Sequence, residues 1–248
     1  MRMSRSVKKL LRECHGELFG AMRLYSLPPQ VRDTIRGVRR RGLTYLSRAR
    51  LVKLANIALW NENNGVAGMI VEAGCARGGS SIVMAAAKAP QREMWIHDVF
   101  GMIPRPSEKD GADVHDRYEI IEAGCARGIK GKPYYGYVQD LQKEVVNGFR
   151  ECGYPIEENN IRLFKGLLQD TLEINQPVSL AHIDVDWYEP VYFALQKIEP
   201  WLSDGGAIIV DDYHYWSGCR SAVDNFFSSK RKSFEFDDSA GSLVVVRL

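Results

Sequence analysis

Acidic side chains follow four separate apolar runs of this 248-residue sequence. Glu72 follows the run at 69–71, Asp98 the run at 94–97, Asp184 and Asp186 the run at 178–183, and Asp211 and Asp212 the run at 207–210. A single Asp after a strand is usually a turn former, but this repetition favours a functional interpretation. In an open parallel sheet, ligands bind beyond the carboxyl ends of the strands. The pattern therefore predicts that these carboxylates line one site.

Asp184, Asp211 and Asp212 have the chemistry of a metal site. If the two runs that precede them form neighbouring strands, the three carboxylates converge. Carboxylates with open coordination positions suit a hard divalent cation such as Mg²⁺. The alternative interpretation is a set of helix caps and turn formers, but carboxylates gathered without a cation would repel one another. The sequence therefore predicts a divalent-metal site.

The loop at 72–79 has the glycine content of a cofactor-binding turn. Glycines between a strand and a helix let the backbone approach a cofactor closely. The spacing Gly74-x-x-x-Gly78 departs from the dinucleotide pattern, and Glu72 would disfavour a pyrophosphate but suits the ammonium and sulfonium end of S-adenosylmethionine. Asp98 stands 20 residues after Gly78, where an acid commonly binds the ribose hydroxyls. The loop therefore predicts S-adenosylmethionine rather than a nicotinamide cofactor.

Strand-like and helical patterns alternate from residue 68 onward, and these elements must position the acidic groups. Strand-like runs at 69–71, 94–97, 161–168, 178–184, 207–212 and 243–246 are separated by helical patterns at about 80–89, 138–152, 190–202 and 218–229. Pro190 suits the first turn of its helix. This alternation is typical of βαβ units, so the sequence predicts an α/β domain with a parallel sheet.

Residues 1–62 are predicted to form a basic helical extension, because residues 1–50 hold 13 Lys/Arg and only 3 Asp/Glu. Apolar residues recur at helical spacing at Leu10, Leu11, Cys14, Leu18 and Met22, and a second helix is expected over about 47–61. The arm could contact an anionic membrane surface, an anionic polymer or an acidic subunit. We favour packing on the acidic remainder of the chain, across a homodimer or higher oligomer, with no nucleic-acid partner.

Residues 101–137 form an insertion that is too long for an ordinary strand-to-helix connection. Its glycines, prolines and charges predict a lid over the substrates within a catalytic domain of residues 63–248. The heptapeptide Glu-Ala-Gly-Cys-Ala-Arg-Gly occurs at 72–78 and again at 122–128, inside this insertion. Only the first copy follows a strand-like run and precedes a helix, so we interpret the second as coincidence or local duplication.

The composition is that of an ordinary globular protein, with 45% hydrophobic residues and a net charge of +2. No run of 18 apolar residues predicts a membrane span, and the N-terminus lacks the pattern of a signal peptide. The five cysteines are scattered and form no CxxC pair, so neither a disulfide framework nor a zinc site is expected. We therefore expect a cytoplasmic protein without an integral membrane segment.

Several motifs together resemble the macrocin O-methyltransferase family. They lie at 71–80, 95–104, 164–172, 182–189 (His-Ile-Asp-Val-Asp-Trp-Tyr-Glu), 209–213 and 218–224, and the resemblance covers about residues 65–248. Enzymes of this family methylate sugar hydroxyls in antibiotic biosynthesis. The resemblance implies a Rossmann-like class I methyltransferase fold, with a seven-stranded, mostly parallel sheet and helices on both faces. It also implies S-adenosylmethionine and a divalent metal as cofactors.

The same resemblance implies a role for individual residues. Asp184, Asp211 and Asp212 would hold the metal, Asp186 would be the general base, and Glu72, Gly74, Gly78, Ser80 and Asp98 would line the cofactor site. His115, in the predicted lid, is a second candidate for a catalytic contact with the acceptor. The insertion itself matches the family only at Pro104, Asp110, Gly111 and Asp113.

The predicted function is methyl transfer from S-adenosylmethionine to a hydroxyl group of a sugar or glycoside, in natural-product or polysaccharide biosynthesis. A catechol-type O-methyltransferase, which acts on an aromatic diol, is an alternative that shares the metal chemistry. A nicotinamide-dependent oxidoreductase is an alternative of another class, against which the position of Glu72 argues. A non-catalytic binding module anchored by the basic arm is a third.

Overall fold

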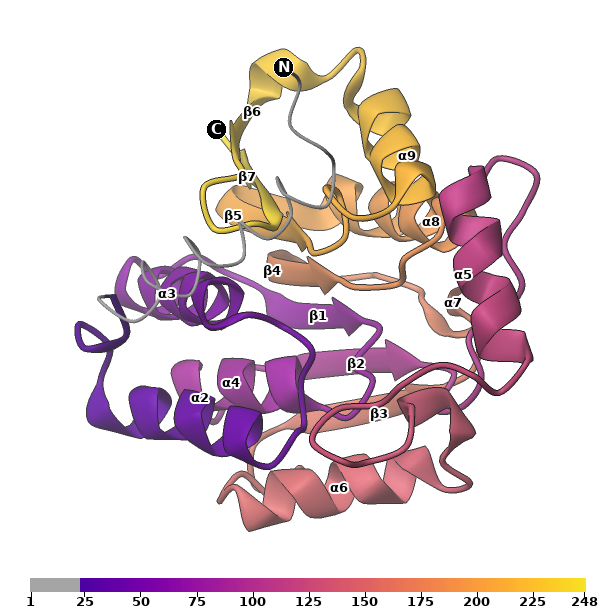
Figure 1. Cartoon of the computed structure of the whole chain (residues 1–248). Coiled ribbons are helices and arrows are strands. Elements are labelled where there is room, and N and C mark those ends of the chain that lie inside the picture. The colour runs from indigo at the N-terminus through magenta and orange to yellow at the C-terminus, as the bar shows by residue number, and fades with distance from the viewer. Residues whose placement is uncertain (1–22) are drawn as a thin grey trace, which may run out of the picture.

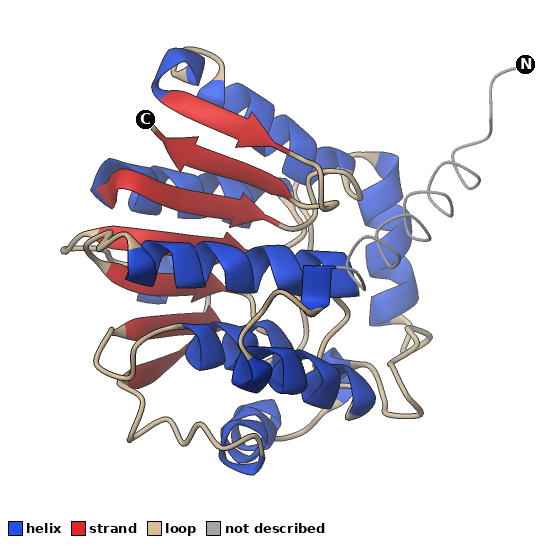
Figure 2. Cartoon of the chain, turned by 90° about the vertical axis from the view of Figure 1, so that its left-hand side faces the viewer, coloured by secondary structure: helices blue, strands red, loops and turns tan. Residues whose placement is uncertain are grey.

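The apolar runs form a single seven-stranded sheet in the computed structural model, which describes residues 23–248. The strands are β1 (Met69–Ala73), β2 (Met94–Asp98), β3 (Ile161–Lys165), β4 (Val178–Ile183), β5 (Leu202–Val210), β6 (Phe234–Asp237) and β7 (Leu243–Arg247), in the order β3-β2-β1-β4-β5-β7-β6. The first five are parallel, and β7 runs antiparallel to both β5 and β6 (Figure 2).

Helices cover both faces of this sheet (Figures 1 and 2). One face carries α2 (Pro29–Arg40), α3 (Arg48–Asn63), α4 (Gly79–Ala87) and α6 (Leu141–Glu151), and the other carries α7 (Leu168–Thr171), α8 (Tyr188–Ile198) and α9 (Ser217–Phe227). Single 3₁₀ turns lie at Tyr135–Tyr137, Glu199–Trp201 and Arg231–Ser233. The predicted sheet with helices on both faces is confirmed. Over residues 23–248, no helix combines the length and the apolar character needed to cross a membrane.

Helix α3 belongs to the core of the sheet domain. Leu51 and Leu54 on α3 are 0% and 1% exposed and share one apolar cluster with Ile70 of β1 and Leu180 of β4. The Asn61 side chain donates a hydrogen bond of 2.8 Å to the carbonyl oxygen of Ser179. The predicted domain boundary between residues 62 and 63 therefore does not separate two hydrophobic cores, because α3 covers this face of the sheet. The predicted helical pattern at Leu10–Met22 lies outside the described residues.

Two predictions of element boundaries differ from the structure near β5. Helix α8 ends at Ile198 rather than at 202, and the predicted turn at 204–206 lies within the bounds of β5. The pairing of β5 with β4 shifts register there, and Gly205 has a φ of 72°, so the strand is irregular where the turn was expected. Strand β6 was not predicted, since this short edge strand pairs only with β7.

The insertion places α5 (Ala112–Glu122) beyond the carboxyl ends of β1, β2 and β4, at the right of Figure 1. Asp110 accepts a hydrogen bond of 2.8 Å from the backbone N–H of Tyr188, at the start of α8. Asp113 likewise accepts one of 3.0 Å from the backbone N–H of Ser217, at the start of α9. Helix N-termini favour such carboxylates. The insertion is therefore attached to the domain through Asp110 and Asp113, two of the residues at which it resembles the family.

Replacing Leu54 with Ala tests whether α3 is part of the core. We expect the free energy of unfolding to fall by about 2–5 kcal/mol, because the change leaves a cavity in a fully buried site. Chemical denaturation of the full chain measures this loss. The matched control is Asn63→Ala on the exposed end of the same helix, which should change stability by less than about 0.5 kcal/mol. Equal effects of both changes would contradict the assignment.

Candidate active site

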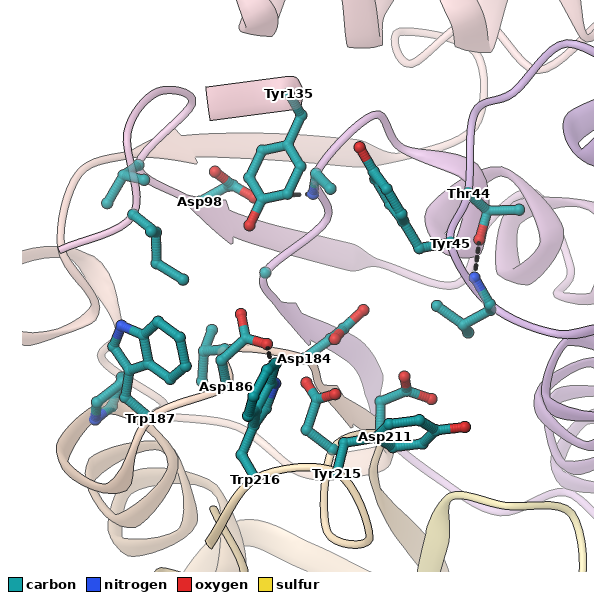
Figure 3. A pocket seen from close by; sticks show the side chains of 18 of the residues that line it. Thr44, Tyr45, Asp98, Tyr135, Asp184, Asp186, Trp187, Asp211, Tyr215 and Trp216 are labelled. Carbon is teal, nitrogen blue, oxygen red and sulfur yellow. Dashed lines mark hydrogen bonds between the residues drawn. The ribbon is translucent and has the colours of Figure 1, made fainter. Parts of the chain in front are cut away.

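One cavity opens where β1, β2, β4 and β5 end, beneath the insertion (Figure 3). Its volume is about 1380 Å³, above the range of about 300–1,000 Å³ usual for ligand sites. Six of the predicted site residues line it, namely Gly74, Asp98, Asp184, Asp186, Asp211 and Asp212. They converge because the parallel order β2-β1-β4-β5 brings the ends of these strands to the same edge of the sheet. The cavity therefore has room for two small molecules side by side.

Asp184, Asp211 and Asp212 form a compact acidic cluster. One carboxylate oxygen of each lies within 4.8 Å of the others. The backbone N–H of Asp211 donates to the carbonyl oxygen of Ile183 at 3.0 Å, which continues the pairing of β4 with β5 to the cluster. Oδ2 of Asp212 is buried and has no hydrogen-bond partner among the described residues. Hard oxygen donors at this spacing, one of them unsatisfied, fit a divalent cation.

The cluster concentrates negative charge in a buried place. Burial raises the pKa of Asp184 well above its usual range, and the carboxylates of Asp211 and Asp212 raise it further. Burial likewise raises the pKa of Asp212 well above its usual range, helped by Asp186 and Asp211. Without a cation the site therefore retains protons, because like charges in a poorly solvated place disfavour ionisation.

Asp186 lies beside this cluster in a left-handed conformation, with a φ of 58°. The chain is therefore not extended at Asp186, and its carboxylate lines the cavity from this turn. Nε1 of Trp216 donates a hydrogen bond of 2.8 Å to Oδ1 of Asp186 (Figure 3). Burial raises the pKa of Asp186 to about 6. A carboxylate with this pKa is suited to accept a proton near neutral pH.

Asp98 shapes the glycine-rich loop from its place at the end of β2. Its Oδ2 accepts hydrogen bonds from the backbone N–H groups of Cys75 and Ala76, at 2.8 and 3.0 Å. Gly74 has a φ of 84°, and a Cβ there would lie 2.0 Å from the carbonyl oxygen of Asp184. The close approach of β4 therefore requires glycine at this position. The glycine-rich loop therefore lies against Asp98 on one side and against Asp184 of the acidic cluster on the other.

The structure differs from the prediction at Glu72, Gly78 and Ser80, which do not line the cavity. Glu72 still lies within β1 and is 0% exposed, and its carboxylate accepts hydrogen bonds from Ser81 and from Nδ1 of His182, the latter at 2.8 Å. Ser80 is buried within α4, and Gly78 precedes this helix with a φ of 81°. These residues support the loop from behind, because the strand has not yet ended at Glu72.

His115 does not reach the cavity either. This residue is half-buried on α5, and its Nε2 lies 3.1 Å from the carbonyl oxygen of Ser107, inside the insertion. It is absent from the cavity lining, whereas Asp186 is part of it. The geometry therefore favours Asp186 over His115 as the base.

Arg50 is a residue of the site that the sequence analysis missed. It stands in the first turn of α3 and is 8% exposed, and its Nη1 lies 2.5 Å from Oδ2 of Asp211. Its guanidinium group also covers the ring of Tyr215, with 4.2 Å to the ring centroid. Ser242 donates a hydrogen bond of 2.8 Å to the other oxygen of Asp211. Arg50 therefore offsets one of the three negative charges of the cluster and fixes Asp211.

Aromatic side chains complete the cavity wall. Trp187, Tyr215 and Trp216 line it, as do Tyr45 and the adjacent pair Tyr134 and Tyr135. Tyr45 and Tyr135 meet edge to face with 5.9 Å between ring centroids. Tyr188 and Tyr213, which lie close to the carboxylates in the sequence, do not line the cavity. The closely spaced tyrosines at 134, 135 and 137 are the sequence feature that could have indicated Tyr134 and Tyr135, which the sequence analysis missed.

This chain is similar to a family of known methyltransferases and to individual members of known activity. Residues 10–235 match the profile of the family described as Macrocin-O-methyltransferase (TylF), so the match includes α2 and α3, beyond the resemblance over about 65–248. The 8-demethyl-8-(2,3-dimethoxy-alpha-L-rhamnosyl)-tetracenomycin-C 4'-O-methyltransferase of Streptomyces olivaceus is 32% identical over 66% of this chain and 59% of that protein. The demethyldecarbamoylnovobiocin O-methyltransferase of Streptomyces niveus is 30% identical over 71% of this chain and 62% of that protein. The chain spans about three fifths of the length of these relatives.

The fold is likewise similar to those of solved O-methyltransferases. The O-methyltransferase NovP superposes with a TM-score of 0.68 and 25% identity, over 82% of this chain and 81% of that one. The calicheamicin methyltransferase CalS11 shares the fold at a TM-score of 0.54 and 16% identity, over 99% of this chain and 94% of that one. The class I methyltransferase fold that the resemblance implied is confirmed.

Stability of the metal-free protein should depend on pH in a direction set by the acidic cluster. The folded state raises the pKa values of Asp184, Asp186 and Asp212, so it binds protons more tightly than the unfolded chain does. This stabilisation is present below the ordinary carboxyl pKa and is lost as the pH rises through the folded values. We expect the free energy of unfolding in a chelator to fall as the pH rises from the ordinary carboxyl pKa of about 4 through about 6, the folded pKa of Asp186, and further through the raised pKa values of Asp184 and Asp212.

Asp184→Asn is the control that isolates this effect, since other groups titrate as well. Burial lowers the pKa of His97 to about 4, which acts in the opposite direction. Denaturation at each pH should show a shallower loss of stability in Asp184→Asn than in the wild type. An identical pH dependence in both proteins would show that the cluster does not hold protons.

Replacing Arg50 should destabilise the fold, because the negative charge of Asp211 is then no longer compensated. We expect Arg50→Met to lower the free energy of unfolding by about 3–5 kcal/mol, because it leaves the buried Asp211 carboxylate without its cation. Asp211→Asn in the same background removes that carboxylate, so the double variant should lose much less than the sum of the two single variants. Additive losses in this double-mutant cycle would refute the coupling.

Proposed function

Since this chain belongs to the macrocin-O-methyltransferase family, we propose that it transfers the methyl group of S-adenosylmethionine to a hydroxyl group of a sugar or glycoside. One observation carries the proposal: the glycine-rich loop, Asp98, the acidic cluster and Asp186 open into the same cavity. The names of the two Streptomyces relatives, a rhamnosyl-tetracenomycin 4'-O-methyltransferase and a demethyldecarbamoylnovobiocin O-methyltransferase, support this class of acceptor.

The cofactor is assigned to the part of the cavity between Gly74 and Asp98. When bound, S-adenosylmethionine supplies a methyl group on a positively charged sulfur. Gly74 lets the backbone approach that group, and Asp98 holds the loop through the N–H groups of Cys75 and Ala76. Glu72 acts behind the loop by positioning His182 and Ser81.

The divalent metal, most simply Mg²⁺, is assigned to Asp184, Asp211 and Asp212. A bound cation would supply the Lewis acidity that lowers the pKa of an acceptor hydroxyl. The three carboxylates together with Arg50 carry a net charge of −2 when ionised, which a divalent cation would neutralise. Arg50 and Ser242 hold Asp211 in place through its Oδ2 and Oδ1 oxygens, respectively.

Asp186 is assigned as the general base. Trp216 fixes its Oδ1, and with a pKa of about 6 the carboxylate is mostly ionised at neutral pH. It takes the proton of the acceptor hydroxyl while the oxygen forms its bond to the methyl carbon and the bond from that carbon to sulfur breaks. The proton stays on Asp186 until solvent removes it. Orientation of both reactants by the cavity lowers the barrier further.

The alternatives from the sequence differ in what they predict for this cavity. A catechol-type enzyme would methylate an aromatic diol in preference to a glycoside. A nicotinamide-dependent oxidoreductase would bind a pyrophosphate beside the loop, where Asp98 and the acidic cluster oppose a second negative group. A binding module would transfer no methyl group at all. The family match favours the first proposal over all three.

We assign residues 101–137 as a cover over the acceptor that is anchored at Asp110 and Asp113. Trypsin should cut this cover at Arg127 or Lys130, both exposed, and should cut more slowly once S-adenosylhomocysteine and Mg²⁺ are present. Equal cleavage in all conditions would show that the insertion does not act as a lid.

We also propose that the chain forms a homodimer or higher oligomer. A monomer mass measured by light scattering would contradict this proposal.

Methyl transfer with two matched variants tests the proposed function. Labelled S-adenosylmethionine should transfer its methyl group to members of a glycoside panel more readily than to catechols, and only with Mg²⁺ present. Asp186→Asn should lower turnover by about 10²–10⁴-fold while metal binding stays intact. Asp184→Asn should instead weaken metal binding, so that excess Mg²⁺ restores part of the activity.

Calorimetric metal titration beside initial rates separates the two roles. If Asp186→Asn loses metal affinity as strongly as Asp184→Asn, then Asp186 is a ligand and not the base. S-adenosylhomocysteine should raise the melting temperature of the wild type, and NAD⁺ should not. A rise with NAD⁺ alone would overturn the methyltransferase assignment.

A further inference from the structure

Tyr135 is a residue of the insertion that reaches into the centre of the cavity. It stands in the 3₁₀ turn Tyr135–Tyr137, is half-buried and lines the cavity. Figure 3 shows its hydroxyl directed into the cavity, between Asp98 and Asp186. Burial raises the pKa of Tyr135 well above its ordinary value, and the charges of Asp186, Tyr134 and Asp98 add to this shift. Tyr135 is therefore a neutral aromatic side chain placed between two carboxylates.

The glycine-rich loop supports the turn that carries Tyr135. Nη2 of Arg77, a fully buried side chain of this loop, donates a hydrogen bond of 2.6 Å to the carbonyl oxygen of Pro133. Nη1 of the same arginine forms an ion pair with Glu144 on α6. The ring of Tyr45 meets the ring of Tyr135 edge to face, with 5.9 Å between the centroids. The ring of Tyr135 is therefore held in place by the loop to which the cofactor is assigned.

The reaction itself restricts where the charged sulfur of the cofactor can lie. Methyl transfer needs the sulfur, the methyl carbon and the acceptor oxygen in one line. The cofactor is assigned to the space beside Gly74 and Asp98, and the acceptor hydroxyl to Asp186. The sulfur and its methyl group must then lie between these two places, in the space that Tyr135 borders (Figure 3).

The surroundings of Tyr135 favour a positive charge on a ligand. An aromatic ring attracts a cation that approaches its face, and does so more strongly where water is excluded. Two cationic side chains of the cavity act on other acids: Nη1 of Arg50 lies 2.5 Å from Oδ2 of Asp211, and burial raises the pKa of Asp186, which Arg117 helps to lower. The attraction of the ring is lost when the sulfur is neutral, so Tyr135 can distinguish a sulfonium from a thioether.

We propose that Tyr135 is a positioning residue whose ring contacts the positively charged sulfur of S-adenosylmethionine, and that it raises the affinity for this cofactor relative to the neutral product S-adenosylhomocysteine. The inference rests on the proposed methyl transfer and adds a residue that separates cofactor from product. Tyr135 exchanges no proton in this role. Once the methyl group has left, the sulfur is neutral and the ring no longer holds it, which favours release of the product.

Calorimetric titration of the full chain tests this without relying on turnover. Each protein is titrated in Mg²⁺ with S-adenosylmethionine and, separately, with S-adenosylhomocysteine, and no acceptor is present, so no methyl group is transferred. The quantity compared is the ratio of the dissociation constant of S-adenosylhomocysteine to that of S-adenosylmethionine. Because both constants belong to the same variant, a general loss of affinity cancels in this ratio.

Tyr135→Leu should lower this ratio by about fivefold or more, because it removes the ring that attracts the cation. Tyr135→Met should do the same, and its flexible side chain fills more of the space that the ring leaves. Tyr135→Phe keeps the ring, so its ratio should stay within about twofold of the wild type. The control is Tyr118→Leu, which removes a ring from α5 of the same insertion but outside the cavity lining, and it should leave the ratio unchanged. Melting temperatures establish that each variant is folded.

Two results would overturn the inference. One is that Tyr135→Leu and Tyr135→Met keep the ratio of the wild type, and the other is that Tyr135→Phe loses as much as they do, which would assign the effect to the hydroxyl and not to the ring. In both cases a wild type that still binds S-adenosylmethionine and transfers its methyl group retains the proposed function. A wild type that binds neither compound would instead refute the proposed function.

Discussion

Buried negative charge at the ends of β4 and β5 is the constraint on which much of the structure depends. Asp184, Asp211 and Asp212 lie too close together to be ionised without compensation. Arg50 supplies part of that compensation from α3, and protons or a divalent cation must supply the rest. Helix α3 packs on the sheet through its apolar residues, and the same packing brings the guanidinium group of Arg50 to the strand ends.

Other walls of the cavity come from segments outside the βαβ repeat. The insertion is attached at the starts of α8 and α9 through Asp110 and Asp113, so the same helices that follow the acidic strands also hold the cover. Gly218 at the start of α9 allows this approach, because a Cβ there would lie 1.9 Å from Oδ1 of Asp110. The shape of the cavity thus depends in part on segments with little periodic pattern.

The acidic residues of the site were predictable because each follows an apolar run, and parallel strands bring their ends to one edge. Asp98 and Asp184 were found in this way. The predicted end of the first strand was too early, because β1 continues through Glu72. The side chain of Glu72 is therefore turned to His182 rather than to the cavity. Arg50 was missed because nothing in the pattern of α3 distinguishes an arginine that covers the sheet from one in water.

The repeated heptapeptide separates what the sequence determined from what only the tertiary structure decided. In both copies the first glycine takes a left-handed conformation, with a φ of 84° at Gly74 and 74° at Gly124, because it follows an element that ends there. Yet Glu72 is buried in β1, whereas Glu122 is the exposed last residue of α5. Neighbouring strands β2 and β4 hydrogen-bond the first copy on both sides, and the second has no strand beside it in the described residues. Local sequence therefore determined where the chain turns, while the choice between strand and helix, and with it the place of the site, depended on which backbone groups lay alongside to pair with.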